Sequence, residues 1–212
     1  MIGIIDYGMG NLFSVSKALE RLEVPYLISD EPVALMEADG LILPGVGAIK
    51  DAMELLHRTG LSNTIIDFAA TGKPLLGICL GMQLLFEESE ENGGTRGLGL
   101  LPGYVKKFPG VTAEGISYKV PHMGWNQLKF INESPILKKV DEDFVYFVHS
   151  YYAVTEAADV LIASSQYDVD VPAVVGKENI FGTQFHPEKS SKAGMRILLN
   201  FTKMAEERMG VS

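Results

Sequence analysis

A lone thiol is the side chain of this sequence best suited to covalent chemistry. Cys79 is the only cysteine among 212 residues, and it lies in the pentapeptide Gly77-Ile78-Cys79-Leu80-Gly81. The apolar pair Leu75-Leu76 precedes this segment, and a helix-like stretch follows it at residues 82–86. Strand, sharp turn and helix form a nucleophile elbow, whose flanking glycines avoid clashes in a strained backbone. We therefore predict that Cys79 is a nucleophile, favoured as the thiolate by the N-terminus of the following helix.

A second polar cluster, Phe185-His186-Pro187-Glu188, follows a strand-like run near the end of the chain. Open α/β sheets collect their functional groups at the carboxyl ends of the strands, so we expect His186 to reach Cys79. An imidazole can take the thiol proton and return it to a leaving group, and Glu188 can orient that imidazole. His122 and His149 are alternative bases that composition does not exclude.

Acyl transfer also needs hydrogen-bond donors for the oxyanion that develops on the substrate. The amide of Leu80, directly after the nucleophile, is one candidate. The segment Pro44-Gly45-Val46-Gly47 ends a neighbouring apolar run and is a candidate for the second donor, at Val46.

Strands and helices alternate in the first half of the chain, which predicts a parallel sheet with helices on both faces. The expected strands are 2–5, 26–28, 40–43 and the run before Cys79, and the expected helices are 12–22, 48–57 and 65–70. The second half is richer in strands, expected at 104–108, 144–148, 160–165, 173–177 and 180–185, with a final helix. We predict an α/β fold with a mostly parallel, doubly wound (flavodoxin-like) sheet and a β-rich extension, in one domain spanning residues 1–212.

Composition excludes several classes of function. The formal net charge of −9 argues against nucleic-acid binding, which needs clustered Lys and Arg. The sequence has no uncharged apolar stretch of about 18 residues, and residues 1–6 resemble a first strand and not a signal peptide. One cysteine cannot form an internal disulfide, which fits a reducing cytosol. We predict a cytoplasmic enzyme without a cofactor or a metal ion.

Further segments extend these motifs over nearly the whole chain. They are Ile5-Asp6-Tyr7-Gly8-Met9-Gly10-Asn11, Leu43-Pro44-Gly45-Val46-Gly47, Pro121-His122-Met123-Gly124-Trp125-Asn126, His149-Ser150-Tyr151-Tyr152 and Gln184-Phe185-His186-Pro187-Glu188-Lys189-Ser190. With the Cys79 elbow, they resemble the class I (triad-type) glutamine amidotransferases, and among these the glutaminase subunits of imidazole glycerol phosphate synthase, from histidine biosynthesis. Many relatives in the wider family carry two consecutive glycines where this chain has Gly45-Val46, and this departure suits the histidine-pathway branch.

The resemblance implies a reaction and a set of roles. Cys79 would attack the side-chain amide of glutamine, His186 would pass a proton to the departing ammonia, and Glu188 would orient His186. Water would then hydrolyse the glutamyl thioester. The glutamine pocket would be lined by Gly47, Gln83, Glu91, Ser150 and Tyr151. Gln83 follows Cys79 by one helical turn and so faces the same site, whereas Glu91 could pair with the substrate ammonium group.

A partner is expected because ammonia released into water becomes ammonium, which is not a nucleophile. The sequence has neither a second catalytic domain nor a P-loop. The resemblance implies a heterodimer with a (β/α)₈-barrel cyclase subunit, which receives the ammonia and makes imidazole glycerol phosphate and 5-aminoimidazole-4-carboxamide ribonucleotide. The exposed residues expected at the docking face are Tyr7, Asn11, Met123, Trp125, Asn126 and Lys189.

Three alternatives stay open from the sequence. The chain could serve another amidotransferase, for anthranilate, guanylate, purine or pyridoxal phosphate synthesis, although residues 44–47 and 121–126 argue against this. A cysteine hydrolase or protease of the flavodoxin-like type would share the elbow but would not explain the His-Pro-Glu segment. A non-catalytic subunit with the same fold would not need Cys79, His186 and Glu188.

Overall fold

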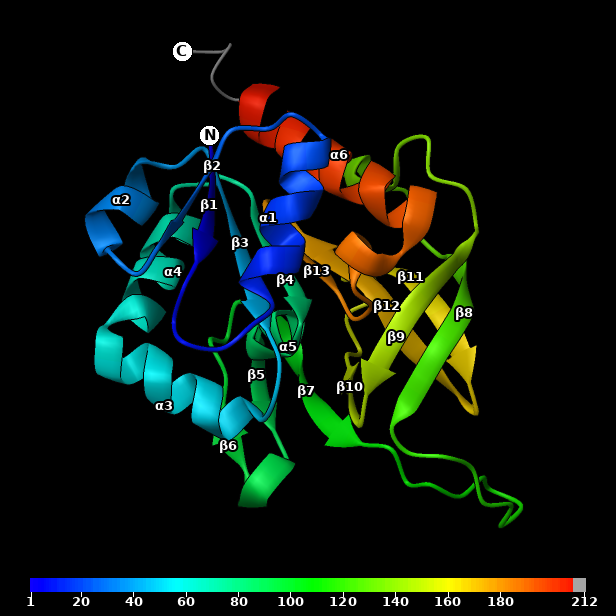
Figure 1. Ribbon diagram of the computed structural model, residues 1–212. Helices are drawn as coiled ribbons and strands as arrows, with labels where there is room; N and C mark the ends of the chain where they lie inside the picture. The colour runs from blue at the N-terminus through cyan, green and yellow to red at the C-terminus, as the bar shows by residue number, and fades with distance from the viewer. Residues whose placement is uncertain (208–212) are drawn as a thin grey trace.

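The computed structural model describes residues 1–207 and arranges their strands in two sheets (Figure 1). The larger sheet has nine strands in the order β2-β1-β3-β4-β13-β12-β11-β8-β9, and the smaller has four in the order β10-β7-β5-β6. Residues 208–212, which the predicted domain includes, lie outside the described part of the chain.

Five neighbouring strands of the larger sheet run parallel. They are β1 (Ile2–Ile5), β2 (Tyr26–Ser29), β3 (Gly40–Gly45), β4 (Leu75–Cys79) and β13 (Ile180–Thr183). Their side chains are apolar on both faces, as a sheet covered on both sides requires. Ile4, Ile42 and Leu76 belong to one core cluster, and their neighbours Ile5 and Leu41 belong to the other.

The helices divide between the two faces in the same way. Residues of α1 (Leu12–Arg21) and α6 (Ser191–Glu207) pack in the first cluster, and residues of α2 (Pro32–Glu37), α3 (Ile49–Thr59), α4 (Leu61–Ala70) and α5 (Leu80–Leu84) pack in the second. Figure 1 shows α1 and α6 together, apart from α2, α3 and α4. The predicted doubly wound α/β arrangement is confirmed.

The second half is β-rich, as expected, and most of its strand pairs are antiparallel, so the larger sheet is mixed. It contains β7 (Leu101–Lys107), β8 (His122–Phe130), β9 (Phe144–His149), β10 (Tyr151–Val154), β11 (Leu161–Tyr167) and β12 (Val169–Lys177). The two residues Glu178 and Asn179 join β12 to the antiparallel β13 in a tight hairpin turn, in which Glu178 has a φ of 56°.

Two local expectations were wrong. The helix after Cys79 does not run through residues 82–86, because α5 ends at Leu84 and Phe86 begins β5 (Phe86–Ser89), which pairs with β6 (Thr95–Arg96) and β7. The final strand ends at Thr183, so His186 lies in the connection that precedes a short 3₁₀ helix, η3 (Pro187–Lys189). Phe86 is fully buried, which explains its apolar character without a helix.

Candidate active site

Cys79 is the last residue of β4, and its backbone has a φ of 55° and a ψ of −110°. This conformation is costly for a residue with a side chain. The flanking glycines are sterically required: a Cβ on Gly81 would lie 1.8 Å from the Leu43 carbonyl oxygen, and a Cβ on Gly77 would lie 2.5 Å from the Gly81 oxygen. The predicted elbow geometry is confirmed.

His186 and Glu188 form a buried pair beside the elbow. The Nδ1 atom of His186 lies 2.8 Å from Oε1 of Glu188, and the two side chains are only 4% and 1% exposed. Burial is the largest influence on the pKa of His186 and lowers it, but hydrogen bonds to Cys79 and Glu188 outweigh burial and raise this pKa to about 9. The imidazole is therefore protonated at neutral pH and can act as a proton donor.

The two alternative bases, His122 and His149, are engaged elsewhere. Nδ1 of His149 lies 2.7 Å from the Tyr151 carbonyl oxygen, and Nε2 of His149 lies 2.9 Å from Nδ1 of His122. Burial lowers the pKa of His149 to about 3. Both ring nitrogens of His149 are thus occupied, whereas the imidazole of His186 interacts with the sulfur of Cys79.

A cavity of about 430 Å³ opens in front of Cys79. Cys79 and His186 line it together, although they come from distant parts of the sequence. The two residues expected to supply the oxyanion donors and all five expected in the substrate pocket also line it: Leu80, Val46, Gly47, Gln83, Glu91, Ser150 and Tyr151. The fold therefore brings together in one pocket every one of these residues that the sequence singled out.

The pocket also involves residues that sequence reasoning did not single out. Gln184 is fully buried, and its Nε2 atom lies 3.8 Å from the sulfur of Cys79. Its Oε1 atom accepts a hydrogen bond from Nε2 of Gln83 at 3.0 Å. The Val148 carbonyl oxygen lies 3.9 Å from the sulfur, and Pro121 lines the cavity. Gln184 could have been found, since it lies two residues before His186 in the same motif.

Glu91 has a second partner besides any substrate. Its Oε2 atom accepts a 2.8 Å hydrogen bond from the backbone N–H of Ile49, the first residue of α3. A carboxylate at a helix N-terminus is stabilised by the unpaired N–H groups there. Glu91 thus connects the acidic segment after β5 to α3 while it faces the cavity.

The residues expected at a docking face differ in exposure. Tyr7 is only 3% exposed, so its place among the exposed docking residues was wrong: it packs beside the elbow, where its hydroxyl would lie 2.8 Å from a Cβ on Gly45. Asn11 is half-buried and caps α1 by accepting a hydrogen bond from the Ser14 N–H. The burial of Tyr7 and of Asn11 depends on tertiary contacts, which the local sequence around each residue does not reveal.

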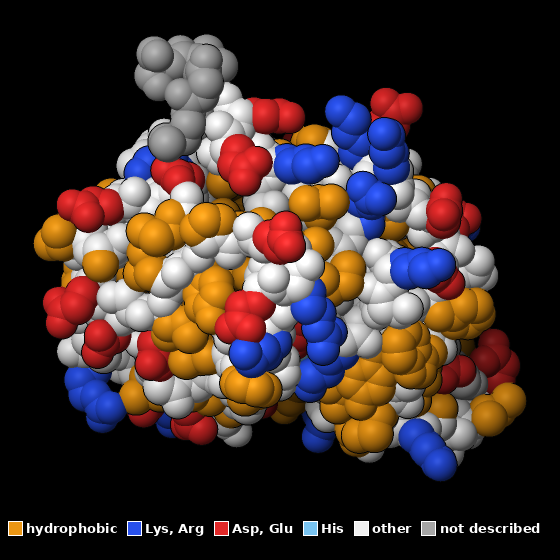
Figure 2. Space-filling view, turned by 45° about the horizontal axis from the view of Figure 1, so that its top comes forward, with side chains coloured by type: hydrophobic (Ala, Val, Ile, Leu, Met, Phe, Trp, Pro, Cys, Tyr) orange, Lys and Arg blue, Asp and Glu red, His pale blue; other side chains and the backbone are white. Residues whose placement is uncertain are grey.

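The remaining docking candidates lie nearer the surface. Met123 and Trp125 on β8 are 62% and 50% exposed, and Lys189 is exposed, whereas Asn126 is half-buried. Phe144, on the paired strand β9, is 52% exposed. Figure 2 shows hydrophobic side chains gathered at the lower right of its view, on the side of the molecule where Figure 1 places β8 and β9. We call Met123, Trp125 and Phe144 the β8–β9 apolar face.

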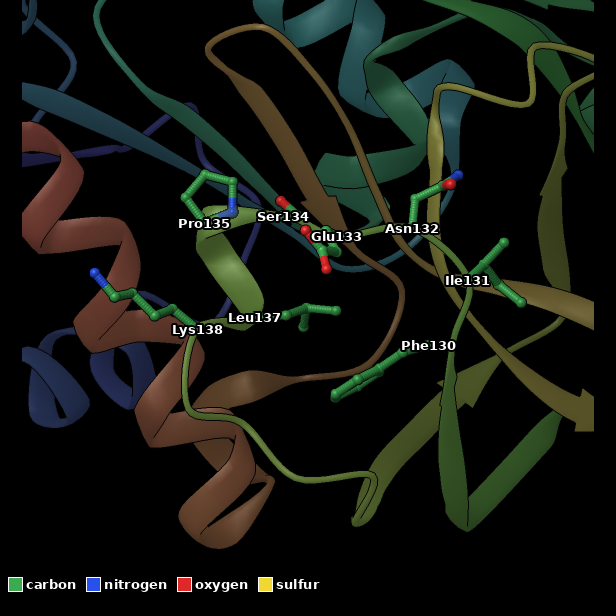
Figure 3. A pocket seen from close by; sticks show the side chains of 8 residues that line it. All are labelled: Phe130, Ile131, Asn132, Glu133, Ser134, Pro135, Leu137 and Lys138. Carbon is green, nitrogen blue, oxygen red and sulfur yellow. The ribbon is translucent and has the colours of Figure 1, made fainter.

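A second cavity, of about 560 Å³, shares no lining residue with the cavity at Cys79 (Figure 3). Its lining residues run from Phe130, the last residue of β8, to Lys138, just after the 3₁₀ helix η2 (Pro135–Leu137). Glu133 and Lys138 are its ionisable residues. Within residues 1–207, no cluster of His, Cys, Asp or Glu is arranged to hold a metal ion, and no helix is long and apolar enough to span a bilayer.

Comparison with known proteins places the chain in a family. The family model for class-I glutamine amidotransferases matches residues 3–205. Imidazole glycerol phosphate synthase subunit HisH of Geobacillus sp. (strain WCH70) is 65% identical over 206 residues, covering 97% of this chain and 98% of the relative. The subunit of the same name from Bacillus subtilis (strain 168) is 60% identical over 208 residues, covering 98% of both chains.

Solved structures agree on the fold. PurLQS from Thermotoga maritima has a TM-score of 0.72 at 20% identity, covering 95% of this chain and 97% of that one. The glutaminase domain of CTPS from Trypanosoma brucei has a TM-score of 0.66 at 17% identity, covering 97% and 93%. The chain belongs to the class-I glutamine amidotransferase family. Within that family, its relatives at 57–65% identity are imidazole glycerol phosphate synthase HisH subunits, and it is a member of this group.

Proposed function

We propose that the chain is the glutaminase subunit of an imidazole glycerol phosphate synthase, and that it hydrolyses L-glutamine with Cys79, His186 and Glu188. The observation that supports this most strongly is the shared cavity, lined by the sulfur, by the imidazole and by every residue expected to hold glutamine. High identity to HisH subunits over nearly the full length supports the particular synthase.

In the first half of the reaction, the Cys79 thiolate attacks the side-chain carbonyl carbon of glutamine and forms a tetrahedral intermediate. The imidazolium of His186, held by Glu188 at 2.8 Å, gives its proton to the departing nitrogen. The C–N bond breaks, ammonia leaves, and a glutamyl thioester remains on Cys79.

In the second half, His186 is neutral and can take a proton from water. The resulting hydroxide attacks the thioester carbon, and the C–S bond breaks. The Cys79 thiolate and the His186 imidazolium are restored, and the new side-chain carboxyl group loses its proton to solvent as glutamate leaves. Each half passes through an oxyanion, for which we assign the donors at Leu80 and Val46, since both residues line the cavity.

We assign glutamine binding to Gly47, Gln83, Glu91, Ser150 and Tyr151. Glu91 supplies the negative charge for the substrate ammonium group, and its bond to the N–H of Ile49 holds the carboxylate in place. Gln83 donates 2.9 Å and 3.0 Å hydrogen bonds to the Tyr151 carbonyl and to Gln184, so its amide is already oriented. Preorganisation of this kind reduces the entropy lost on binding.

We propose that ammonia passes to a cyclase subunit in a heterodimer, within the cytosol. The β8–β9 apolar face, with Lys189 and Asn126, is the assigned docking surface. Three large apolar side chains at least half exposed support this choice, since aromatic residues with a polar surround are typical of protein interfaces. Asn11 stays a candidate through its exposed part, and Tyr7 does not.

The test compares glutamine-driven with ammonia-driven synthesis by the complex with a cyclase subunit. Cys79→Ala and His186→Ala are expected to abolish the glutamine-driven reaction and to leave the ammonia-driven reaction intact. His57→Ala is the matched histidine control, because His57 is exposed and, within residues 1–207, its ring hydrogen-bonds only to Ser62. Loss of the ammonia-driven reaction in the Cys79 variant would show that the assigned role is wrong.

A second measurement addresses the oxyanion donor at Val46. Its side chain is 43% exposed at the end of β3, where the neighbouring Gly47 has a φ of 97°. We propose that this turn forms its donor only when the partner holds its nucleotide ligand. Glutamine hydrolysis by the isolated chain at the rate of the liganded complex would refute this.

A further inference from the structure

Two buried histidines form a hydrogen-bonded chain that the reaction described above does not use. His122 is fully buried and lies directly opposite His149, which is 6% exposed, in the register of β8 and β9. Four contacts follow one another: Tyr151 carbonyl to His149 Nδ1 at 2.7 Å, His149 Nε2 to His122 Nδ1 at 2.9 Å, His122 Nε2 to Asn126 Oδ1 at 2.8 Å, and Asn126 Nδ2 to the Gln166 carbonyl at 3.1 Å.

The two carbonyl groups at the ends of the chain determine where the protons lie. Because a carbonyl oxygen only accepts, Nδ1 of His149 must carry a hydrogen. The Gln166 carbonyl requires the amide nitrogen of Asn126, so the amide oxygen faces His122, and Nε2 of His122 must also carry a hydrogen. With one proton on each ring, Nε2 of His149 and Nδ1 of His122 would then be two lone pairs 2.9 Å apart.

A third proton between the two rings removes this conflict. We propose that the His122–His149 pair holds three ring protons, with His122 as a buried imidazolium, and that the pair positions the Tyr151 side of the glutamine pocket. His122 then donates to both Asn126 and His149, and every contact of the chain is a proper hydrogen bond. This inference rests on the proposed function only for its link to glutamine.

The surroundings of His122 suit a cation. Its ring is stacked on Tyr167 at 3.8 Å and 14°, and on Phe147 at 4.6 Å and 20°, so aromatic faces cover both sides. Aromatic faces carry negative charge density and attract cations, more strongly when water is excluded. The ring centroid of Phe108 lies 6.2 Å from that of His122, with the two ring planes at 90°.

The proton belongs on His122 and not on His149. The pKa of His149 falls to about 3, chiefly because of burial, and the neighbouring His122 and His186 contribute to this fall, against the hydrogen bond to Tyr151, which raises the pKa. Burial, the larger influence, lowers the pKa of His122, and the hydrogen bond to Asn126 raises it only in part, so the third proton is assigned to this ring from the hydrogen-bond geometry. The other titratable groups around the pair are the phenols of Tyr167 and of Tyr118, whose ring meets Tyr167 edge-on, and Asp168 beside Tyr167.

The chain reaches the sulfur through a second set of hydrogen bonds. The Tyr151 carbonyl accepts from His149 and, at 2.9 Å, from Nε2 of Gln83. Gln83 also donates to Gln184, whose Nε2 faces the sulfur of Cys79 at 3.8 Å. The orientation of His149 therefore helps to fix the position of the Tyr151 carbonyl, which in turn orients Gln83, one of the residues assigned to bind glutamine.

Nitrogen-15 NMR of the histidine rings in the full chain at pH 7 tests the proton count. We expect both ring nitrogens of His122 to be protonated, and His149 to be a neutral ring protonated at Nδ1. Asn126→Leu removes the acceptor and is expected to lower the pKa of His122, whereas Asn126→Asp is expected to raise it. Gln127→Leu, at the exposed neighbouring position, is the matched control and should leave it unchanged. Two neutral rings in the unmodified chain would overturn the proposal.

His122→Phe tests the positioning role, since a phenyl ring keeps the stacking but removes the donor to His149. We expect the KM for glutamine in the complex to rise by about fivefold or more, with a smaller change in kcat, as for loss of one buried hydrogen bond. An unchanged KM would overturn the positioning role. Absence of glutamine hydrolysis by the unmodified complex would refute the proposed function instead, and would not alter the ring-proton count.

Discussion

The backbone strain at Cys79 can be measured by comparing two substitutions that both remove the sulfur. Cys79→Ala keeps a Cβ at a φ of 55° and a ψ of −110°, whereas Cys79→Gly does not. The lost contacts to Val148 and Gln184 are common to both variants. Any difference in the free energy of unfolding therefore reports what a Cβ costs at this position.

The expected difference follows from two opposing effects. A side-chain-bearing residue in a sparsely populated backbone region costs about 1–3 kcal/mol. Glycine loses more conformational entropy on folding, which costs about 0.5–1 kcal/mol relative to alanine. Cys79→Gly should therefore be more stable than Cys79→Ala, by about 1 kcal/mol at the centre of a range from about 0 to 2.5 kcal/mol. For a domain of this size the central value is a rise in Tm of roughly 2–4 °C.

Urea unfolding followed by circular dichroism measures both variants under the same conditions. Ala70→Gly is the matched control, because Ala70 is exposed at the end of α4 and is not among the residues with positive φ. There the same exchange should destabilise the chain by about 0.5–1 kcal/mol. If Cys79→Gly were less stable than Cys79→Ala by as much as this control, Cys79 would hold no strain.

Four other outcomes follow from the site and the docking face. Gly81→Ala should lower the free energy of unfolding by about 3 kcal/mol or more in urea titrations, because its Cβ would lie 1.8 Å from the Leu43 carbonyl oxygen, where backbone must move. The pKa of His186 is raised from an ordinary 6.5 to about 9, which corresponds to about 3 kcal/mol of stabilisation of the folded state. This stabilisation is complete below pH 6.5 and is lost as the pH rises past 9. The difference in the free energy of unfolding between the unmodified chain and His186→Asn, measured from about pH 6 to 10, should therefore shrink over that window. Glu188→Gln should lower the pKa of His186 in NMR titrations, and an unchanged pKa would show that the carboxylate has no such influence. Trp125→Ala, at a half-exposed position, should weaken binding to the cyclase subunit by about tenfold in calorimetry while leaving stability within about 0.5 kcal/mol, and equal affinity would remove Trp125 from the docking face.

The sequence allowed prediction where a short motif determines the local geometry. Glycines on both sides of Cys79 pointed to the elbow, because only glycine fits beside the Leu43 carbonyl. Short, continuously apolar runs that alternate with helical segments pointed to the parallel sheet, since strands buried on both faces are apolar throughout. These features depend on neighbours in the chain, and so they can be recognised without knowing the tertiary contacts.

Features set by tertiary packing could not be predicted in the same way. Strand β8 contains Gly124 and Asn126, which are unfavourable in strands, and it forms because it pairs with both β9 and β11. Tyr7 follows β1 in a glycine-rich segment typical of an exposed turn, but the fold places its ring beside Gly45. The link from Gln83 to Gln184 joins segments far apart in the sequence, and no local pattern signals it.

The alternation of side chains along β8 relates the docking face to the interior of the site. Met123 and Trp125 point outward, whereas His122 and Asn126, on the opposite face of the same strand, hydrogen-bond within the protein. Successive side chains of β8 point to opposite faces of the sheet, so Met123 and Trp125 share one short backbone segment with His122 and Asn126. A partner that moved the outer residues would therefore move the inner ones with them, and would act on the hydrogen bonds that end at the Tyr151 carbonyl. Binding at the proposed docking face would thus be coupled to the geometry of the proposed glutamine pocket through one strand.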